Sequence, residues 1–193
     1  MYEVELKFPV SDLASIVRLL AARGAKAGRP VSQCDAYFNH PQRDFAQTDE
    51  AFRIRTVDGL RVAVTYKGPV VDTQTKTRRE IELEFAKSHE TEARLNEMLR
   101  LLSFRPARKV QKLRTPYHLV IDGRDLEVAL DVVEDLGSFV EIETLASEAD
   151  RAEARDAICA LAKELGLSQP ERRSYLRLLV EQDARRESEQ ATG

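Results

Sequence analysis

The segment 3–8 alternates strictly between charged and apolar residues, and this alternation restricts the possible folds more than any other feature of the sequence. In a β-strand, successive side chains point to opposite faces, so one face of this strand would carry only charged groups. In a single strand, such a face ordinarily meets solvent. A repeated pattern of this kind, however, requires a shared explanation. The alternation recurs in the segments 51–57, 78–85, 107–115, 126–133 and 139–145.

Composition excludes several classes of protein. The 193 residues suffice for one sizeable domain, and 42% hydrophobic residues suffice for a core. A net charge of −3 does not predict a nucleic-acid partner. Cys34 and Cys159 are far apart in the sequence, which indicates neither a zinc site nor a disulfide framework. No apolar leader follows Met1 and no run of about 18 apolar residues occurs, so we expect a soluble cytoplasmic protein without membrane contact.

Segments with apolar residues at helical spacing separate the strand-like segments. About eight strands are predicted, and most of them are joined as hairpins, which indicates an antiparallel sheet. We expect one strand to end, or to lie at a sheet edge, at Pro116, because proline cannot donate to a strand ladder. Helices are predicted at 11–23, 89–102, 148–166 and 172–181, and Ser88 is expected to cap the second of them.

The chain shows no linker or low-complexity segment before its C-terminal end. Residues 1–182 are therefore expected to form a single domain. Residues 183–193 are polar and are expected to form a disordered tail. The polar segment 70–77 is expected to be a mobile loop.

If the apolar strand faces pack outward beneath the helices, the charged faces point inward, and a closed antiparallel barrel with a polar lumen results. Buried charges without partners are very costly. A bound polyanion would neutralise the cations, and a divalent metal would neutralise the carboxylates; internal salt bridging without a ligand is the alternative. The expected lumen cations are Lys7, Arg53, Arg55, Lys67, Arg78, Arg108, Lys112 and Arg114, and the expected anions are Glu3, Glu5, Glu80, Glu82, Glu84, Asp131, Glu141 and Glu143.

These residue types indicate the chemistry of the ligand. Carboxylate oxygens are hard ligands, and the chain has no cluster of cysteine and histidine, so Mg²⁺ or Mn²⁺ is favoured over zinc. Arginine supplies forked contacts to phosphate oxygens, and lysine supplies a point charge. The expected ligand is therefore a metal–polyphosphate complex.

The residues Glu3-Val4-Glu5-Leu6-Lys7 resemble the ExExK motif that opens the CYTH domains. These domains belong to the triphosphate tunnel metalloenzymes, which include class IV adenylate cyclases and thiamine triphosphatases. Further segments resemble the family in the same order over residues 2–180. They are 52–55, 66–69, 79–82, 112–114, Asp131, 139–143 and 172–175.

The resemblance implies an α+β fold with an eight-stranded antiparallel β-barrel, the triphosphate tunnel, flanked by helices. It implies that Lys7 lies near the reacting end, and it leaves Glu80, Glu82 and Asp131 as metal ligands, water-orienting catalytic groups or salt-bridge partners. The implied metal ligands are Glu3, Glu5, Glu141 and Glu143, and the implied triphosphate-binding residues are Arg53, Arg55, Lys67, Lys112 and Arg114.

The overall resemblance favours an enzyme like class IV adenylate cyclases, which converts ATP to cyclic AMP and pyrophosphate. A His-Phe pair that precedes ExExK in such cyclases is absent, because only two residues precede Glu3, and this argues against cyclase activity. A tripolyphosphatase, a thiamine triphosphatase-like hydrolase or a non-catalytic polyphosphate-binding module therefore stay open. A homodimer also stays open.

Overall fold

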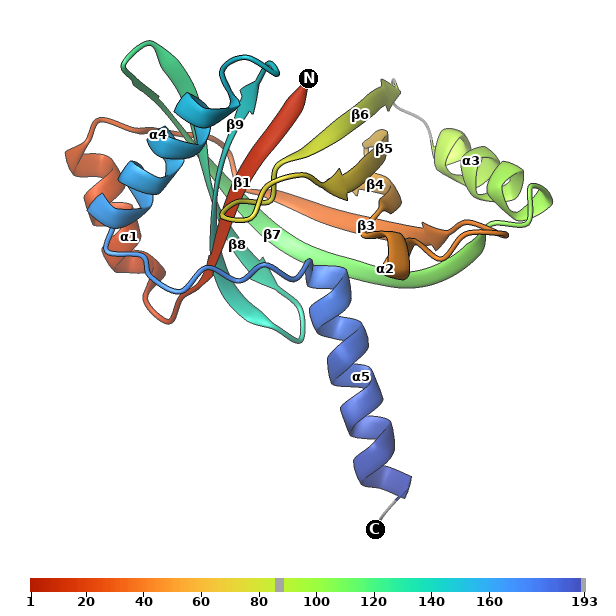
Figure 1. Ribbon diagram of the computed structural model, residues 1–193. Coiled ribbons are helices and arrows are strands. Elements are labelled where there is room, and N and C mark those ends of the chain that lie inside the picture. Colours follow the sequence, from red (N-terminus) through yellow and green to blue (C-terminus); the bar gives the residue numbers. More distant parts are fainter. Residues whose placement is uncertain (86–88, 192–193) are drawn as a thin grey trace.

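The strands form one antiparallel sheet that closes on itself as a barrel (Figure 1). The computed structural model describes residues 1–85 and 89–191. The strand order is β2-β7-β3-β4-β5-β6-β1-β9-β8, and an additional pairing between β7 and β8 completes the circle. Eight strands make the barrel, and the short β2 is an extra strand beside β7. The predicted α+β fold with an eight-stranded antiparallel barrel is confirmed.

The elements follow one another without a long unstructured connection. The strands are β1 (Tyr2–Pro9), β2 (Lys26–Ala27), β3 (Val31–Asn39), β4 (Ala51–Val57), β5 (Arg61–Val70), β6 (Arg78–Phe85), β7 (Arg105–Ile121), β8 (Arg124–Val133) and β9 (Gly137–Ala146). The helices are α1 (Leu13–Ala22), α2 (Phe45–Thr48), α3 (His89–Leu101), α4 (Arg151–Glu164) and α5 (Tyr175–Ala191). In this described part of the chain, no helix has the length and apolar character that a membrane span requires.

Both faces of β1 are buried, unlike those of a strand whose polar face meets water. Its apolar residues Val4, Leu6 and Phe8 are at most 6% exposed and belong to the main hydrophobic core. Its charged residues are equally inaccessible: Glu3 is 8% exposed, Glu5 7% and Lys7 1%. Because the two sets alternate along the strand, the charged set faces the inside of the barrel.

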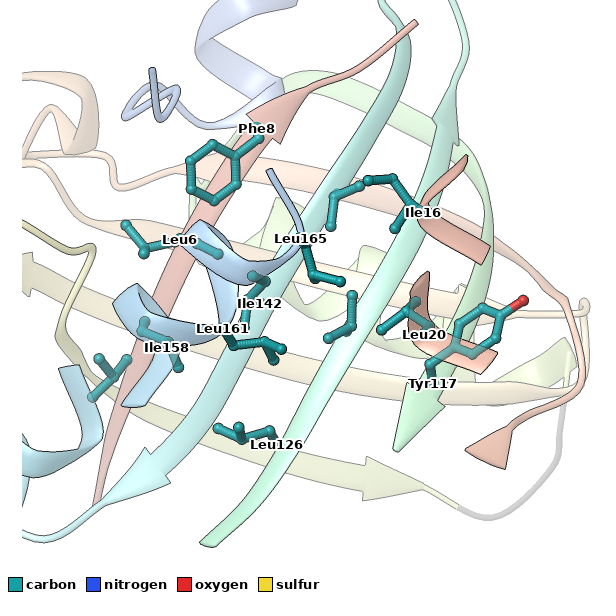
Figure 2. Packing of buried hydrophobic residues seen from close by; sticks show 14 of the residues in the cluster. Leu6, Phe8, Ile16, Leu20, Tyr117, Leu126, Ile142, Ile158, Leu161 and Leu165 are labelled. Carbon is teal, nitrogen blue, oxygen red and sulfur yellow. The ribbon is translucent and has the colours of Figure 1, made fainter. Parts of the chain in front are cut away.

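The helices α1 and α4 cover the outward apolar face of β1, β8 and β9 (Figure 1). Ile16 and Leu20 of α1 and Ile158 and Leu161 of α4 pack on this face near Ile142 (Figure 2). Each such apolar side chain stabilises the fold by about 1.5–3 kcal/mol through burial. The expected start of α1 is also present, because Asp12 accepts a hydrogen bond from the Ser15 amide at 3.0 Å.

The strand β7 continues through Pro116, so the first of the two expected alternatives, a strand end, is wrong, whereas the second, a position at a sheet edge, holds locally on the side of β2 and β3. The Pro116 carbonyl accepts a hydrogen bond from the Gly28 amide at 2.7 Å. The missing amide hydrogen of Pro116 faces the same side, where β3 has ended opposite Arg114 and β2 begins opposite Tyr117. Pro116 thus lies in a gap between two partner strands, where no ladder bond is lost.

The C-terminal helix is longer than predicted. The helix α5 continues to Ala191, so residues 183–191 of the expected disordered tail are helical, and residues 192–193 lie outside the described residues. Glu181 forms ion pairs with Arg177 and Arg185 at helical i, i+4 spacing, at 2.8 and 4.0 Å. Ser88, the expected cap of α3, also lies outside the described residues.

Candidate active site

The charged strand faces converge on one cavity of about 160 Å³ inside the barrel. Asp131 is fully buried behind its wall and bonds to two of the lining cations, Lys112 and Arg114. The structure thus brings every predicted site residue together. The other predicted residues line the cavity directly: Glu3, Glu5, Lys7, Arg53, Arg55, Lys67, Glu80, Glu82, Lys112, Arg114, Glu141 and Glu143.

Three carboxylates form a cluster in this wall. Each of Glu3, Glu5 and Glu143 offers an oxygen, and these oxygens lie within 4.8 Å of one another. The strand register explains the grouping, because Glu3 and Glu5 share a face of β1 and Glu5 lies directly opposite Glu143 on β9. We call these three residues the carboxylate cluster.

The carboxylate cluster fits a divalent cation of the kind that prefers oxygen. Burial raises the pKa of Glu3, but the Lys67 ammonium 2.5 Å away outweighs this effect and brings the pKa to about 2. Burial and the neighbouring Glu3 carboxylate raise the pKa of Glu143 to about 8, and Glu143 forms no ion pair with any described residue. A cation beside these three oxygens would supply the missing counter-charge.

Glu141 belongs to a different group of charges. Its carboxylate accepts a hydrogen bond from Arg114 and lies 3.8 Å from the Lys112 ammonium. Asp131 accepts from Arg114 through both carboxylate oxygens, at 2.8 and 2.7 Å, and from Lys112 at 2.7 Å. The hydroxyl of Tyr175 donates to the same carboxylate at 3.0 Å. Glu141 is therefore paired with cations outside the carboxylate cluster.

Asp35 holds the two arginines of β4. Its carboxylate accepts a forked pair of hydrogen bonds from Arg55, at 2.6 and 2.7 Å, and a third from Arg53 at 3.2 Å. Asp35 is 2% exposed. Burial by itself raises the pKa of Asp35, but Arg53 and Arg55 reverse this effect and hold the pKa well below its usual range. Both guanidinium groups are thereby fixed at the cavity wall.

Lys67 links the carboxylate cluster to the mouth of the cavity. Its ammonium lies 2.5 Å from a Glu3 oxygen and 3.0 Å from a Glu80 oxygen. Burial raises the pKa of Glu80 to about 7, and the Glu3 carboxylate contributes to this shift against the opposing charge of Lys67. Glu80 can therefore accept or release a proton at neutral pH.

Lys7 lies at the opposite end of the cavity from the mouth. Its ammonium donates a hydrogen bond to the Arg173 carbonyl at 2.5 Å and stands 4.0 Å from the centre of the Tyr175 ring. Burial and the neighbouring Lys76 ammonium lower the pKa of Lys7 to about 7. The residues before α5 thus close this end of the barrel around Lys7.

The sequence analysis missed two charged residues of the cavity wall. Asp35 is the only charged residue of β3, so the repeated charge alternation of the other strands did not mark it, and its period-2 spacing with Gln33 and Tyr37 was a weaker signal. Lys76 had no such signal, because it lies in the segment 70–77 that was expected to be a mobile loop. Thr75, Lys76 and Thr77 are instead buried, and the Lys76 ammonium pairs with Glu5 at 3.2 Å.

Two residues expected in the lumen lie outside it. Arg108 faces α5, where it pairs with Asp183 at 2.9 Å, because α5 covers the inner face of β7 beyond Lys112. Glu84 is exposed near the end of β6. The pairing of β6 with β1 is limited to Arg78 and Arg79, so the rest of β6 diverges from the barrel wall.

This divergence opens the barrel into a wide basin. The basin has a volume of about 1690 Å³, and Glu3, Glu80, Glu82 and Glu143 line both it and the inner cavity. Its remaining wall comes largely from the β7–β8 hairpin and the end of β9. The smaller cavity, whose lining residues are mostly charged, is the candidate active site, and the basin forms its entrance.

Comparisons with known proteins agree with this architecture. A Methanocaldococcus jannaschii protein named "putative adenylate cyclase" is 36% identical over 181 residues, which are 92% of this chain and 98% of that protein. The structure of the PH1819 protein from Pyrococcus horikoshii is 40% identical, covers 93% of this chain and 99% of its own, and has a TM-score of 0.81.

A more distant structure shows the same fold. A Hippeastrum protein named "putative adenylyl cyclase" and described as having a dominant triphosphatase activity is 17% identical, with a TM-score of 0.64 and coverage of 92% of this chain and 93% of its own. The family model of the CYTH domain matches residues 1–175. The Methanocaldococcus jannaschii relative is 36% identical to this chain over almost its whole length. Together with the family-model match, this identity shows that the chain belongs to the CYTH domain family.

Proposed function

We propose that this protein is a divalent-metal-dependent enzyme that acts on a triphosphate inside the barrel. The observation that carries this proposal is the arrangement of the cavity, where the carboxylate cluster faces a wall of arginine and lysine side chains. Eight of the residues lining the cavity are Lys or Arg. Such a site complements a polyanion bound together with a cation.

We assign Mg²⁺ or Mn²⁺ to the carboxylate cluster of Glu3, Glu5 and Glu143. A divalent ion supplies neutralisation of charge on phosphate oxygens. Glu141, which the family resemblance implies as a fourth ligand, is paired with Arg114 in this structure, so we place it beside the cluster as a ligand that Arg114 must first release.

The remaining residues have distinct roles in the proposal. Lys7, at the closed end, and Glu80, at the mouth, have pKa values of about 7 and can each hold or transfer a proton there. Glu82 orients the attacking group at the same mouth, and Asp131 positions Lys112 and Arg114. The side chains that bind phosphate oxygens are Arg53, Arg55, Lys67, Lys112 and Arg114.

The first candidate reaction is that of a class IV adenylate cyclase-like enzyme. In this reaction the ribose 3′-hydroxyl of ATP attacks the α-phosphate, and cyclic AMP and pyrophosphate are released. The basin of about 1690 Å³ at the mouth supports this candidate, since it offers room for a nucleoside next to the phosphate-binding cavity. The name of the Methanocaldococcus jannaschii relative also supports it.

The second candidate is hydrolysis of a triphosphate, with water attacking the terminal phosphate. One feature of the basin favours it: among the described residues that line the basin, none is Phe, Tyr or Trp, and the His118 imidazole is the one aromatic ring that could stack on a base. The Hippeastrum protein shows that the fold itself is compatible with a dominant triphosphatase activity. Inorganic tripolyphosphate would need only the inner cavity.

A product assay decides between the candidates. The purified protein is incubated with Mg²⁺ or Mn²⁺ and, separately, with ATP, tripolyphosphate and thiamine triphosphate. Cyclic AMP with pyrophosphate identifies a cyclase, and orthophosphate identifies a hydrolase. Retained tripolyphosphate binding without either product would contradict an enzyme and indicate a polyphosphate-binding module.

Lys67→Ala should weaken the binding of ATP and tripolyphosphate alike. A charge-assisted contact to phosphate contributes about 1.5–3 kcal/mol, and both ligands carry the same three phosphate groups. Isothermal titration of the variant with each ligand measures the loss, and Lys109→Ala, at an exposed position of β7, is the control. A loss confined to ATP would show that Lys67 contacts the nucleoside instead.

Metal binding should strengthen as the pH rises toward about 8. Glu143 has a raised pKa of about 8, so it is protonated at lower pH and must lose this proton before it can bind a cation. Mg²⁺ and Mn²⁺ titrations between about pH 6 and 9 should show this dependence, and Glu143→Gln should flatten it. An affinity that is independent of pH over this range would remove Glu143 from the proposed ligand set.

A further inference from the structure

Part of the strand β6 has an open edge. The strand pairs with β5 along most of its length, whereas its pairing with β1 is limited to Arg78 and Arg79. Among the described residues, none forms a strand beside residues 80–85 on that second side. Figure 1 shows this end of β6 standing apart from β1 and β9. The backbone N–H and C=O groups along such an edge can pair with a further strand.

The outer face of the same stretch is apolar and uncovered. Ile81 is 45% exposed and Leu83 is 59% exposed. The helices α1 and α4 cover the barrel over β1, β8 and β9, and α3 packs over β4 and β5. Within the described part of the chain, Ile81 and Leu83 belong to none of the hydrophobic clusters. The open edge and the exposed apolar face therefore coincide.

The inner face of the stretch is acidic and borders the basin. Glu82 and Glu84 are exposed on this face, and Glu80 and Glu82 line the basin. Of the described residues that line the basin, nine are Asp or Glu and three are Lys or Arg. Two of these three cations already form ion pairs with acids of the same wall, at 2.7 and 2.9 Å. The basin is thus predominantly negative and favours a partner that carries positive charge.

We propose that the open edge of β6 binds an extended segment of another protein in which Lys or Arg alternates with apolar residues. Successive side chains of a strand point to opposite faces, so the apolar set covers Ile81 and Leu83 while the basic set faces Glu82, Glu84 and the basin. The basin volume of about 1690 Å³ exceeds the roughly 300–1,000 Å³ of small-molecule sites and leaves room for such a segment.

Charge complementarity selects this partner over a second copy of the chain. If two β6 edges paired with each other, Glu82 and Glu84 of both copies would lie on the same face, and like charges at such positions are destabilising. The C-terminal residues 183–191 are helical and show no alternation of basic and apolar residues. The interface does not depend on the triphosphate reaction, so it goes beyond the proposed function.

A labelled synthetic peptide of about eight alternating lysine and valine residues is the probe. Fluorescence anisotropy with the full chain should show binding of this peptide and none of a glutamate–valine control peptide. Two further peptides carry methyl groups on the lysine or on the valine backbone nitrogens. One of these two should lose binding and the other should keep it, because alternate backbone N–H groups point to the same side of a strand.

Hydrogen exchange and two variants locate the site. Amides of residues 80–85 that face the open edge should exchange rapidly in the free protein and become protected when the lysine peptide binds. Leu83→Lys, which removes the apolar contact, and Glu84→Lys, which reverses the charge, should each weaken binding about 10-fold or more. Leu101→Lys is the matched control, because Leu101 is 69% exposed on α3, and it should bind the peptide as the wild type does.

Several outcomes would overturn the proposal. Failure of the wild type to bind the lysine peptide would do so directly. Equal binding of both methylated peptides, or binding without protection of residues 80–85, would show attraction to the acidic basin without strand pairing. Unchanged affinity in Leu83→Lys would exclude the apolar face. Light scattering that shows a dimeric wild type and a monomeric Leu83→Lys would assign the edge to a second copy of this chain.

Discussion

Replacing Glu5 with Gln is expected to lower the rate of triphosphate turnover by on the order of 100-fold or more. Glu5 is 7% exposed and shares the carboxylate cluster with Glu3 and Glu143. Glutamine keeps the shape of the side chain but removes the charge that a divalent cation would bind. Because metal affinity and turnover depend on the same charge, both should fall together while the fold survives.

The measurement combines a Mg²⁺ or Mn²⁺ titration with steady-state turnover of the substrate identified by the product assay. Glu84→Gln is the matched control, because Glu84 is also an acidic residue of a barrel strand but is exposed and outside the cavity wall. The control should behave as the wild type. An active Glu5→Gln enzyme with an unchanged metal titration would refute the role of the carboxylate cluster.

The polar lumen was predictable because its signal is local. On β1, charged and apolar residues alternate without interruption, and the recurrence of this pattern on several other strands favours a barrel in which the charged faces point inward. In the structure, the antiparallel pairing of β1 with β9 brings Glu5 opposite Glu143. For this reason the predicted site residues meet in one cavity.

The partners within the cavity were less predictable, because they depend on contacts between distant segments. Glu141 and Glu143 have the same spacing on β9, but the first pairs with Arg114 and the second stays without an ion pair among the described residues. Lys76 reaches Glu5 from a segment without periodicity. Sequence alternation gives the face on which a side chain lies, whereas its partner depends on the strand across the lumen.

Internal salt bridging, the alternative to a bound ligand, accounts for most but not all of the lumen charges. Asp35 and Asp131 each hold two cations at distances of 3.2 Å or less. These pairs give the cations of the wall counter-charges within the protein. Glu143 and Arg78 have no ion pair with any described residue, and their opposite charges match a cation and an anion. The unpaired groups, and not the number of charges, therefore favour a ligand.

Asp131→Asn is expected to lower the free energy of unfolding by about 3 kcal/mol, since it removes the nearer counter-charge of two buried cations and leaves them only Glu141. Asp131 is fully buried and bonds to Lys112, Arg114 and Tyr175. Burial by itself raises the pKa of Asp131, but Arg114 and Lys112 lower it below its usual range. Its contribution is therefore present above about pH 4 and lost as the pH falls through its lower folded-state pKa.

Denaturant unfolding of the wild type and of Asp131→Asn at neutral and acidic pH measures the difference between their free energies of unfolding. This difference should become smaller as the pH falls. Asp135→Asn is the control, because Asp135 lies in an exposed pair with Arg108 at 3.8 Å and such pairs contribute at most about 1 kcal/mol. If Asp131→Asn lowered the free energy of unfolding no more than Asp135→Asn does, Asp131 would not be the residue that holds the two cations.

The same variant also separates a ligand-binding lumen from a purely structural one. Lys112 and Arg114 are freed from Asp131 in the variant, so an added polyanion can take the place of the lost carboxylate. Tripolyphosphate should therefore raise the melting temperature of Asp131→Asn by more than it raises that of the wild type. If the lumen serves only to pair its own charges, tripolyphosphate should raise the melting temperature of neither the wild type nor Asp131→Asn.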